Sequence, residues 1–232
     1  MGLLHSPSIP TNDLLLCVDA ANKRSYSGAG TTWSSLVRIL DGTLTNGPTF
    51  SSDNSGFISL DGGNDYVDFG NDVVTPALPF SLQCWVNFPT LGVNEPIFTS
   101  SYHSSNRYGF SAQKNTSNQI VMHINDGGVS GPAARRTGKV SSPTLVANTW
   151  YNLAFVWRGA TDMSIYYDAV SQTVAYEGSG GSINYSSNKP AQIGHFFSHY
   201  GEVKISQLLV YGRELSEREI LQIYKATKGR YQ

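Results

Sequence analysis

Charged side chains are scarce in this sequence. Only 14% of its 232 residues are Asp, Glu, Lys or Arg, well below the usual quarter, and the formal net charge is -1. The Lys and Arg residues are scattered along the chain. Because binding to a phosphate backbone needs clustered basic residues, we expect no nucleic-acid partner.

Long apolar runs and cysteines are also few. No apolar run approaches the roughly 20 residues that span a bilayer, so we expect no membrane span. The first residues lack a basic start, an apolar core and a small-residue cleavage site, so we expect that the chain has no signal peptide and is made in a cytoplasm. The two cysteines, Cys17 and Cys84, lie in apolar segments. A disulfide is one alternative, and two buried thiols are the favoured one, because no secretory context supports oxidation.

Catalytic motifs are missing as well. The sequence has no Gly-x-Ser-x-Gly elbow and no Walker-type glycine loop. His195 and His199 have a spacing that pairs imidazoles on a helix, but their surroundings predict a strand and a loop, so no metal is expected there. Retaining glycoside hydrolysis needs two carboxyl groups about 5 Å apart, and no strand carries a compact acidic cluster. We therefore expect that the chain is not an enzyme, with glycoside hydrolase as the last alternative.

Aromatic residues, in contrast, are plentiful at 12%, and Tyr is the commonest of them. Residues 150–157 are apolar on both strand faces and are followed by a polar turn, 158–162, and a second strand, 164–167. This pattern predicts a central strand of a two-layer β protein. Residues 80–88 alternate strictly between apolar and other side chains and predict a half-buried strand.

Turn signals about every ten residues separate further short strands. The run Asp61-Gly62-Gly63-Asn64-Asp65 predicts a hairpin between 56–60 and 66–69, because Gly and Asn tolerate positive φ. Residues 126–140 predict a long glycine-rich loop. The other predicted strands are 14–20, 42–50, 96–100, 108–113, 119–125, 172–176, 191–197 and 204–211.

The end of the chain changes character. Ser216 with Glu219 three residues later forms a capping-box pattern, and an apolar stripe at helical spacing follows over 220–224. About a dozen short strands and one late helix predict an all-β fold, a two-sheet antiparallel jelly-roll sandwich with one short C-terminal helix. We expect an N-terminal arm, 1–13, and a single domain, 14–232.

Several motifs in order carry a family resemblance. They are Leu16-Cys17-Val18-Asp19-Ala20-Ala21-Asn22, Thr31-Thr32-Trp33, Gly42-Thr43-Leu44 with Asn46-Gly47-Pro48, the 61–67 run, Trp150-Tyr151-Asn152-Leu153-Ala154, and 210–216 with Glu219-Ile220. Together they resemble the laminin-G-like, concanavalin A-like lectin/glucanase domains, from about residue 14 to 231. The opening 19–22 and the ending 225–231 resemble the version found in virion proteins of tailed bacteriophages.

The resemblance implies a structural role. We expect a non-enzymatic virion protein, located on the phage particle in many copies as a head decoration or tail appendage, with other capsid or tail proteins as partners. The alternative is a carbohydrate-binding, adhesive module for host surface glycans. Sugars stack on exposed rings while planar polar groups hold their hydroxyls, although Tyr-rich surfaces also serve protein interfaces. The candidate glycan- or partner-binding residues are Tyr102, His103, Arg107, Tyr108, His199 and Tyr200.

Calcium is the one cofactor that the resemblance leaves open. Many relatives bind it at the rim of the sandwich, and Asp61, Asn64 and Asp65 would supply hard oxygen ligands. In the alternative, Asp61 and Asn64 bond the backbone of their own turn.

Overall fold

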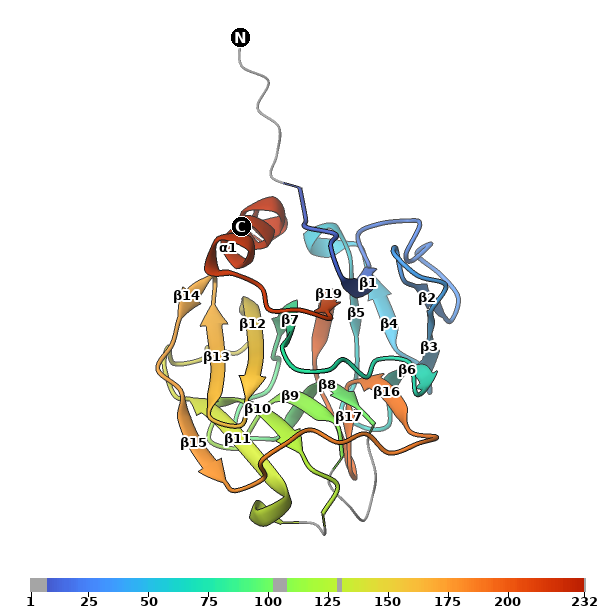
Figure 1. The fold of residues 1–232 in the computed structure, drawn as a ribbon. Coiled ribbons are helices and arrows are strands. Elements are labelled where there is room, and N and C mark those ends of the chain that lie inside the picture. Colours follow the sequence, from blue (N-terminus) through green and yellow to red (C-terminus); the bar gives the residue numbers. More distant parts are fainter. Residues whose placement is uncertain (1–7, 102–107, 129–130, 232) are drawn as a thin grey trace.

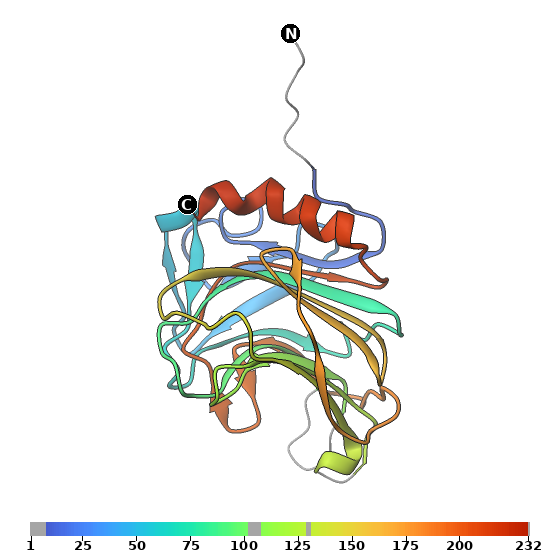
Figure 2. The same ribbon diagram turned by 90° about the vertical axis from the view of Figure 1, so that its left-hand side faces the viewer.

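The fold is a stack of two antiparallel sheets. The computed structural model describes residues 8–101, 108–128 and 131–231. Helix α1 (Glu217–Thr227) covers the outer face of one sheet, so that the layers run helix, sheet, sheet (Figure 1, Figure 2). The predicted all-β sandwich with a C-terminal helix is confirmed. In the described ranges, no helix has the length and apolarity needed to cross a membrane.

The sheet beneath α1 has eight strands. In spatial order they are β14 (Val170–Ser171), β13 (Asp162–Tyr167), β12 (Trp150–Gly159), β7 (Phe80–Asn87), β19 (Lys204–Tyr211), β5 (Phe57–Ser59) and β4 (Thr49–Ser51), with β1 (Leu14–Asp19) also paired to β19. Strand β12 pairs with β7 on one side and β13 on the other. The prediction of a central strand at this place is confirmed.

The second sheet has nine strands. In spatial order they are β15 (Ala175–Gly178), β11 (Arg135–Val140), β10 (Ile120–Asn125), β9 (Phe110–Lys114), β8 (Glu95–Ser100), β16 (Pro190–Ile193), β6 (Tyr66–Asn71), β3 (Asp41–Thr45) and β2 (Thr32–Ser34). A two-stranded hairpin, β17 (His195–Phe196) with β18 (His199–Tyr200), follows β16. Three 3-10 turns complete the elements: η1 (Asp53–Ser55), η2 (Pro132–Ala134) and η3 (Lys228–Arg230).

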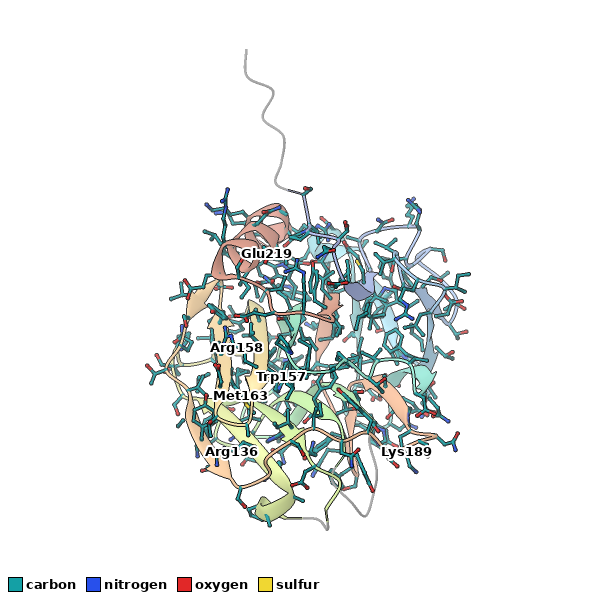
Figure 3. All side chains as sticks on the ribbon, viewed as in Figure 1. Arg136, Trp157, Arg158, Met163, Lys189 and Glu219 are labelled. Carbon is teal, nitrogen blue, oxygen red and sulfur yellow. The ribbon has the colours of Figure 1, made fainter. Side chains whose placement is uncertain are left out.

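The core between the sheets is aromatic. Trp157 of β12, labelled in Figure 3, stacks on Phe80 of β7 with ring centroids 4.7 Å apart and meets Phe110 of β9 edge-on at 5.2 Å. All three side chains are completely or almost completely buried. Because each such ring removes a large apolar area from water, burial contributes about 1.5–3 kcal/mol per side chain.

A second apolar cluster lies beneath α1. Ile220 and Ile223 pack on the outward side chains of β12 and β19. Ser216 accepts from the Glu219 N–H while the Glu219 carboxylate accepts from the Ser216 N–H, which confirms the capping box. The helix also covers the outer face of β7, where the Trp85 indole N–H donates to the Thr227 hydroxyl at 2.7 Å. The prediction of a half-buried strand at 80–88 is wrong, because the cover of α1 is not visible in the alternation.

Several predicted local features differ in the structure. The predicted hairpin around residues 61–65 is a crossover, since β5 belongs to the eight-stranded sheet and β6 to the other. The predicted strand 42–50 is divided at Asn46 and Gly47, both at positive φ, into β3 and β4 of different sheets. The predicted loop 126–140 contains β11, and 191–197 is interrupted at Gly194.

The two cysteines are free and buried. The disulfide alternative is therefore wrong. Burial raises the pKa of the Cys17 thiol to about 12 and raises that of Cys84 as well. Both behave as small apolar side chains.

Candidate binding groove

A row of polar side chains crosses the outer face of the nine-stranded sheet. Residues that are paired across neighbouring strands point to the same face of the sheet, so a row of such pairs can be followed from strand to strand. The row consists of Glu177, Thr137, His123, Ser111, Thr99, Gln192, Asp68, Thr43 and Thr32. Their sequence neighbours, such as Met122 and Ala112, point into the core. The alternation therefore gives this sheet a continuous polar outer surface.

The hairpin β17–β18 covers the middle of this row. The Thr99 hydroxyl donates to the His195 carbonyl at 3.0 Å, and the His195 ring lies 2.8 Å from the Gln192 amide oxygen. The Phe196 ring stacks over His123 with centroids 6.5 Å apart. As a result His123 is only 3% exposed although it lies on the outer face.

Three adjoining hollows, two beside this hairpin and one on the open sheet next to them, form what we call the groove. The first, of about 440 Å³, is lined among others by Glu95 and Glu202. It shares Asn94 and His199 with the second, of about 380 Å³. The second shares Gln113 and Arg135 with the third, of about 130 Å³. The groove therefore has an acidic end and a basic end.

The acidic end is built on β8 and on the segment before β19. Glu95 is 1% exposed, and its carboxylate accepts the Glu202 N–H at 2.7 Å. Burial, with the nearby Glu202 charge adding to it, raises the pKa of Glu95 to about 7 against the effects of that hydrogen bond and of Lys114. Lys114 is fully buried opposite Glu95, where burial lowers its pKa, and its ammonium group donates to the Val93 carbonyl at 2.6 Å.

A cluster of aromatic rings lies beside the first hollow. Tyr200 stacks on His195 with centroids 4.5 Å apart and planes within 9°, and Tyr66 lies 5.4 Å from His195. Tyr200 and the exposed His199 both line the first hollow. Burial lowers the pKa of His195, so that its ring is neutral near pH 7.

The structure places only some of the predicted binding residues together. His199 and Tyr200 line the groove. Tyr108 lies elsewhere, since its ring is so close to Gly127 that a Cβ there would be 2.6 Å from Cε1. Tyr102, His103 and Arg107 fall outside the described residues.

Glu95, Glu202 and Arg135 are groove residues that the sequence reasoning did not find. Glu95 and Glu202 are separated by 107 positions and meet only through the sheet order. Arg135 belongs to β11, which was predicted to be loop. The only signal for this strand was the short alternation of Thr137 and Lys139 with Gly138 and Val140, and Arg136 breaks it on the side of Arg135.

The calcium candidates lie in the turn between β5 and β6. Asp61 accepts the N–H groups of Gly63 at 2.8 Å and Asn64 at 3.3 Å, which lower its pKa. Asp65 is buried and accepts the Asp61 N–H at 3.3 Å. Within the described ranges, no three or more His, Cys, Asp or Glu side chains gather as a metal site. Calcium binding at Asp61, Asn64 and Asp65 stays a prediction.

Residues 61–221 match the family model of the concanavalin A-like lectin/glucanases superfamily, in its laminin G form. The chain belongs to this family. No curated protein sequence matches the chain.

Among solved structures, the chain is similar to a Trypanosoma rangeli sialidase in complex with sialic acid, with a TM-score of 0.64 and 13% identity over 96% of this chain and 34% of that one. It is also similar to the binding domain of botulinum neurotoxin serotype D, with a TM-score of 0.66 and 10% identity over 92% of this chain and 51% of that one. The receptor binding domain of botulinum neurotoxin type G gives a TM-score of 0.61 and 15% identity over 93% and 51%. The chain thus spans about a third to a half of these proteins, and the likeness shows the fold.

The expectation that the chain is not an enzyme is contradicted by these likenesses. Solved structures of similar fold include sialidases, at 13% to 14% identity and over 34% of their length. The same fold also occurs in binding domains. The expectation considered only acids that are close in sequence, whereas Glu95 and Glu202 come from distant segments and line the same hollow.

Proposed function

We propose that the chain binds carbohydrate in the groove. The observation that carries this proposal is the groove itself, in which the Tyr200 ring stands beside exposed His199 and the polar ends of β8 and β9. A sugar ring can stack its apolar face on an aromatic side chain while amide, imidazole and carboxylate groups hold its hydroxyls. The fold shared with the binding domain of botulinum neurotoxin serotype D supports a binding role.

A glycan array with the purified chain tests this proposal. We expect binding to a defined subset of glycans, which Tyr200→Ala weakens at least tenfold because the stacking ring is lost. Tyr200→Phe keeps the ring and is the matched control, expected to bind within about threefold of the natural chain. Binding to no glycan, or equal binding by Tyr200→Ala on a correctly folded chain, would contradict the proposal.

Display on a tailed-bacteriophage particle is the setting that we propose for this binding. It is supported by the motif resemblance of residues 19–22 and 225–231 to phage virion proteins. Location on the head or on a tail appendage would present the groove to host surface glycans. Quantitative mass spectrometry of purified particles should detect the chain in many copies, and its absence from them would end this part of the proposal.

Glycoside hydrolysis in the same groove is a second candidate, favoured by the presence of both Glu95 and Glu202 in the lining of the first hollow. A carboxyl group that keeps its proton up to about pH 7, as Glu95 does, can act as a general acid. Release of reducing ends from the glycans that bind would be the measure, with Glu95→Gln and Glu202→Gln abolishing it. If no bound glycan is cleaved, binding alone remains.

A further inference from the structure

Arg135 is a half-buried cation without a partner in the described part of the chain. Its Nε is buried and makes no hydrogen bond. The other described arginines that are not exposed all have partners: Arg136 donates to backbone carbonyls, and Arg158, Arg213 and Arg230 form ion pairs. Arg135 alone among these described arginines makes no side-chain hydrogen bond or ion pair. Burial of guanidinium N–H donors that have no acceptor costs free energy, which an acceptor on a ligand would offset.

Arg135 lies in the lining of the groove, where a ligand could accept hydrogen bonds from its guanidinium group. Arg135 lines both the second and the third hollow, which are joined through Gln113. Phe196 and Phe197 of the hairpin also line the second hollow. A guanidinium fork in a hollow that is also lined by two aromatic rings and an amide suits a ligand that has one apolar face and an anionic group.

Among the described residues, the charges around Arg135 compensate it only in part. Lys139 and Glu177, the other ionic side chains that line the third hollow, form an ion pair with each other. Burial lowers the pKa of Arg135 and the Glu177 charge opposes that shift only in part, so the cation is poorly solvated where it lies. An anion entering the second hollow would supply the missing counter-charge.

We propose that the basic end of the groove binds the carboxylate of an acidic sugar, paired with the Arg135 guanidinium, with the sugar ring against Phe196 and Phe197. The inference rests on the proposed carbohydrate function and names the substrate class. A sialic acid and a uronic acid share this chemistry. The two acids differ in the substituents of the sugar that Phe196 and Phe197 would contact.

Calorimetric titration with three probes tests the inference. They are 3′-sialyllactose, a glucuronate-containing hyaluronan tetrasaccharide, and neutral lactose. We expect one acidic probe to bind at least tenfold more tightly than lactose, and the preferred probe distinguishes sialic from uronic acid. Arg135→Gln should remove this preference, whereas Arg218→Gln, an exposed arginine of α1 outside the groove, should keep it.

A change in the ligand makes the test independent of protein folding. The methyl ester of the preferred acidic probe lacks the carboxylate charge, and we expect it to bind the natural chain about as weakly as lactose. Equal binding of acid and ester, or an acid preference that survives Arg135→Gln, would overturn the inference. Binding of neutral sugars alone would also overturn it while leaving the proposed function intact, and binding of no sugar would remove both.

Discussion

One guanidinium nitrogen of Arg230 lies 2.9 Å from each carboxylate oxygen of Asp19, so that the last turn of the chain is tied to the first strand of the eight-stranded sheet. The Asp19 side chain is only 6% exposed and also accepts from the Gln207 amide at 3.1 Å. Tyr231, next to Arg230, stacks on Trp85 at 4.0 Å. The ion pair and the ring together fasten the segment after α1 over the sheet.

Loss of this ion pair should destabilise the fold. Arg230→Gln leaves the Asp19 carboxylate buried with one partner fewer, and because Arg230 itself is partly exposed we expect a cost of about 1–3 kcal/mol, below that of a fully buried pair. Chemical denaturation measures the free energy of unfolding. Lys225→Gln, on the exposed side of α1, is the control and should change it by less than about 0.5 kcal/mol.

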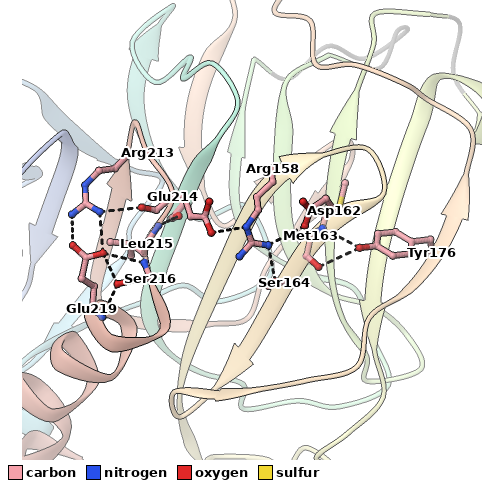
Figure 4. Close-up of polar contacts among 11 residues, drawn as sticks. Arg158, Asp162, Met163, Ser164, Tyr176, Arg213, Glu214, Leu215, Ser216 and Glu219 are labelled. Atoms are coloured by element: carbon pink, nitrogen blue, oxygen red, sulfur yellow. Dashed lines mark hydrogen bonds and ion pairs between the residues drawn. The ribbon is translucent and has the colours of Figure 1, made fainter.

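The N-terminus of α1 should show an acid-dependent stability. Glu219 takes hydrogen bonds from Arg213 and from Ser216 (Figure 4), and the Arg213 contact above all lowers its pKa to about 2. Because the folded chain holds this proton less tightly than the unfolded chain, the stabilisation is complete above about pH 4.5 and is lost as pH falls towards about 2.

Glu219→Gln tests the origin of that dependence. It should cost about 1 kcal/mol at pH 7, the usual value of a helix cap, and should flatten the change of stability between pH 4.5 and 2 relative to the natural chain. Glu217→Gln, exposed in the same helical turn, is the matched control. Equal acid profiles of the natural chain and Glu219→Gln would contradict the assignment.

The sequence predicted what depends on local pattern. The capping box at Ser216 and the apolar stretch of β12 need only neighbours a few residues away. It failed where a tertiary contact decides the outcome: Gln83 and Trp85 alternate as solvent-facing residues do, yet α1 covers them.

In the groove, too, the residues that local sequence reveals differ from those that tertiary contacts bring together. Tyr200 and His199 were found because exposed aromatic and imidazole groups in a loop are a composition signal. Glu95 and Glu202 could not be found, since their approach depends on the bulged pairing of β8 with β9 and on the course of the chain before β19. Arg135 was hidden by three neighbouring glycines, Gly127, Gly128 and Gly131, which indicate a loop although β11 begins a few residues later.

Glu95 should make the fold less stable as pH rises through neutrality. Its pKa is about 7, above the ordinary value of 4.5, so the folded chain holds the proton more tightly than the unfolded chain. The free energy of unfolding therefore includes a favourable contribution below about pH 4.5 that is lost as pH rises to about 7. Glu95→Gln keeps an acceptor for the Glu202 N–H and has no charge to lose.

Thermal unfolding at pH 5 and pH 8 measures this contribution by difference. The natural chain should lose stability relative to Glu95→Gln on going from pH 5 to pH 8, because titration of His195 and other groups is common to both proteins. Glu202→Gln keeps Glu95 and removes only the smallest cause of its raised pKa, so this variant should keep most of the pH dependence. Parallel pH profiles for the natural chain and Glu95→Gln would show that the Glu95 proton is not held in the fold.

Gly178 should be needed both for stability and for the basic end of the groove. It has φ +78°, and a Cβ there would meet the Arg135 carbonyl oxygen and lie 2.7 Å from that of Pro132. Gly70 has φ +84°, and no atom lies within 4 Å of a Cβ placed there. Gly70→Ala should therefore lower the free energy of unfolding only by the left-handed backbone strain, about 1–2 kcal/mol. Gly178→Ala adds a backbone clash, and we expect a total of about 2–4 kcal/mol. Because the clash moves the backbone that carries Arg135, Gly178→Ala should also weaken binding of the acidic probe, whereas Gly70→Ala should not. Similar stabilities for the two variants would contradict the prediction, because β11 and β15 would then move apart around the new Cβ with no loss of stability.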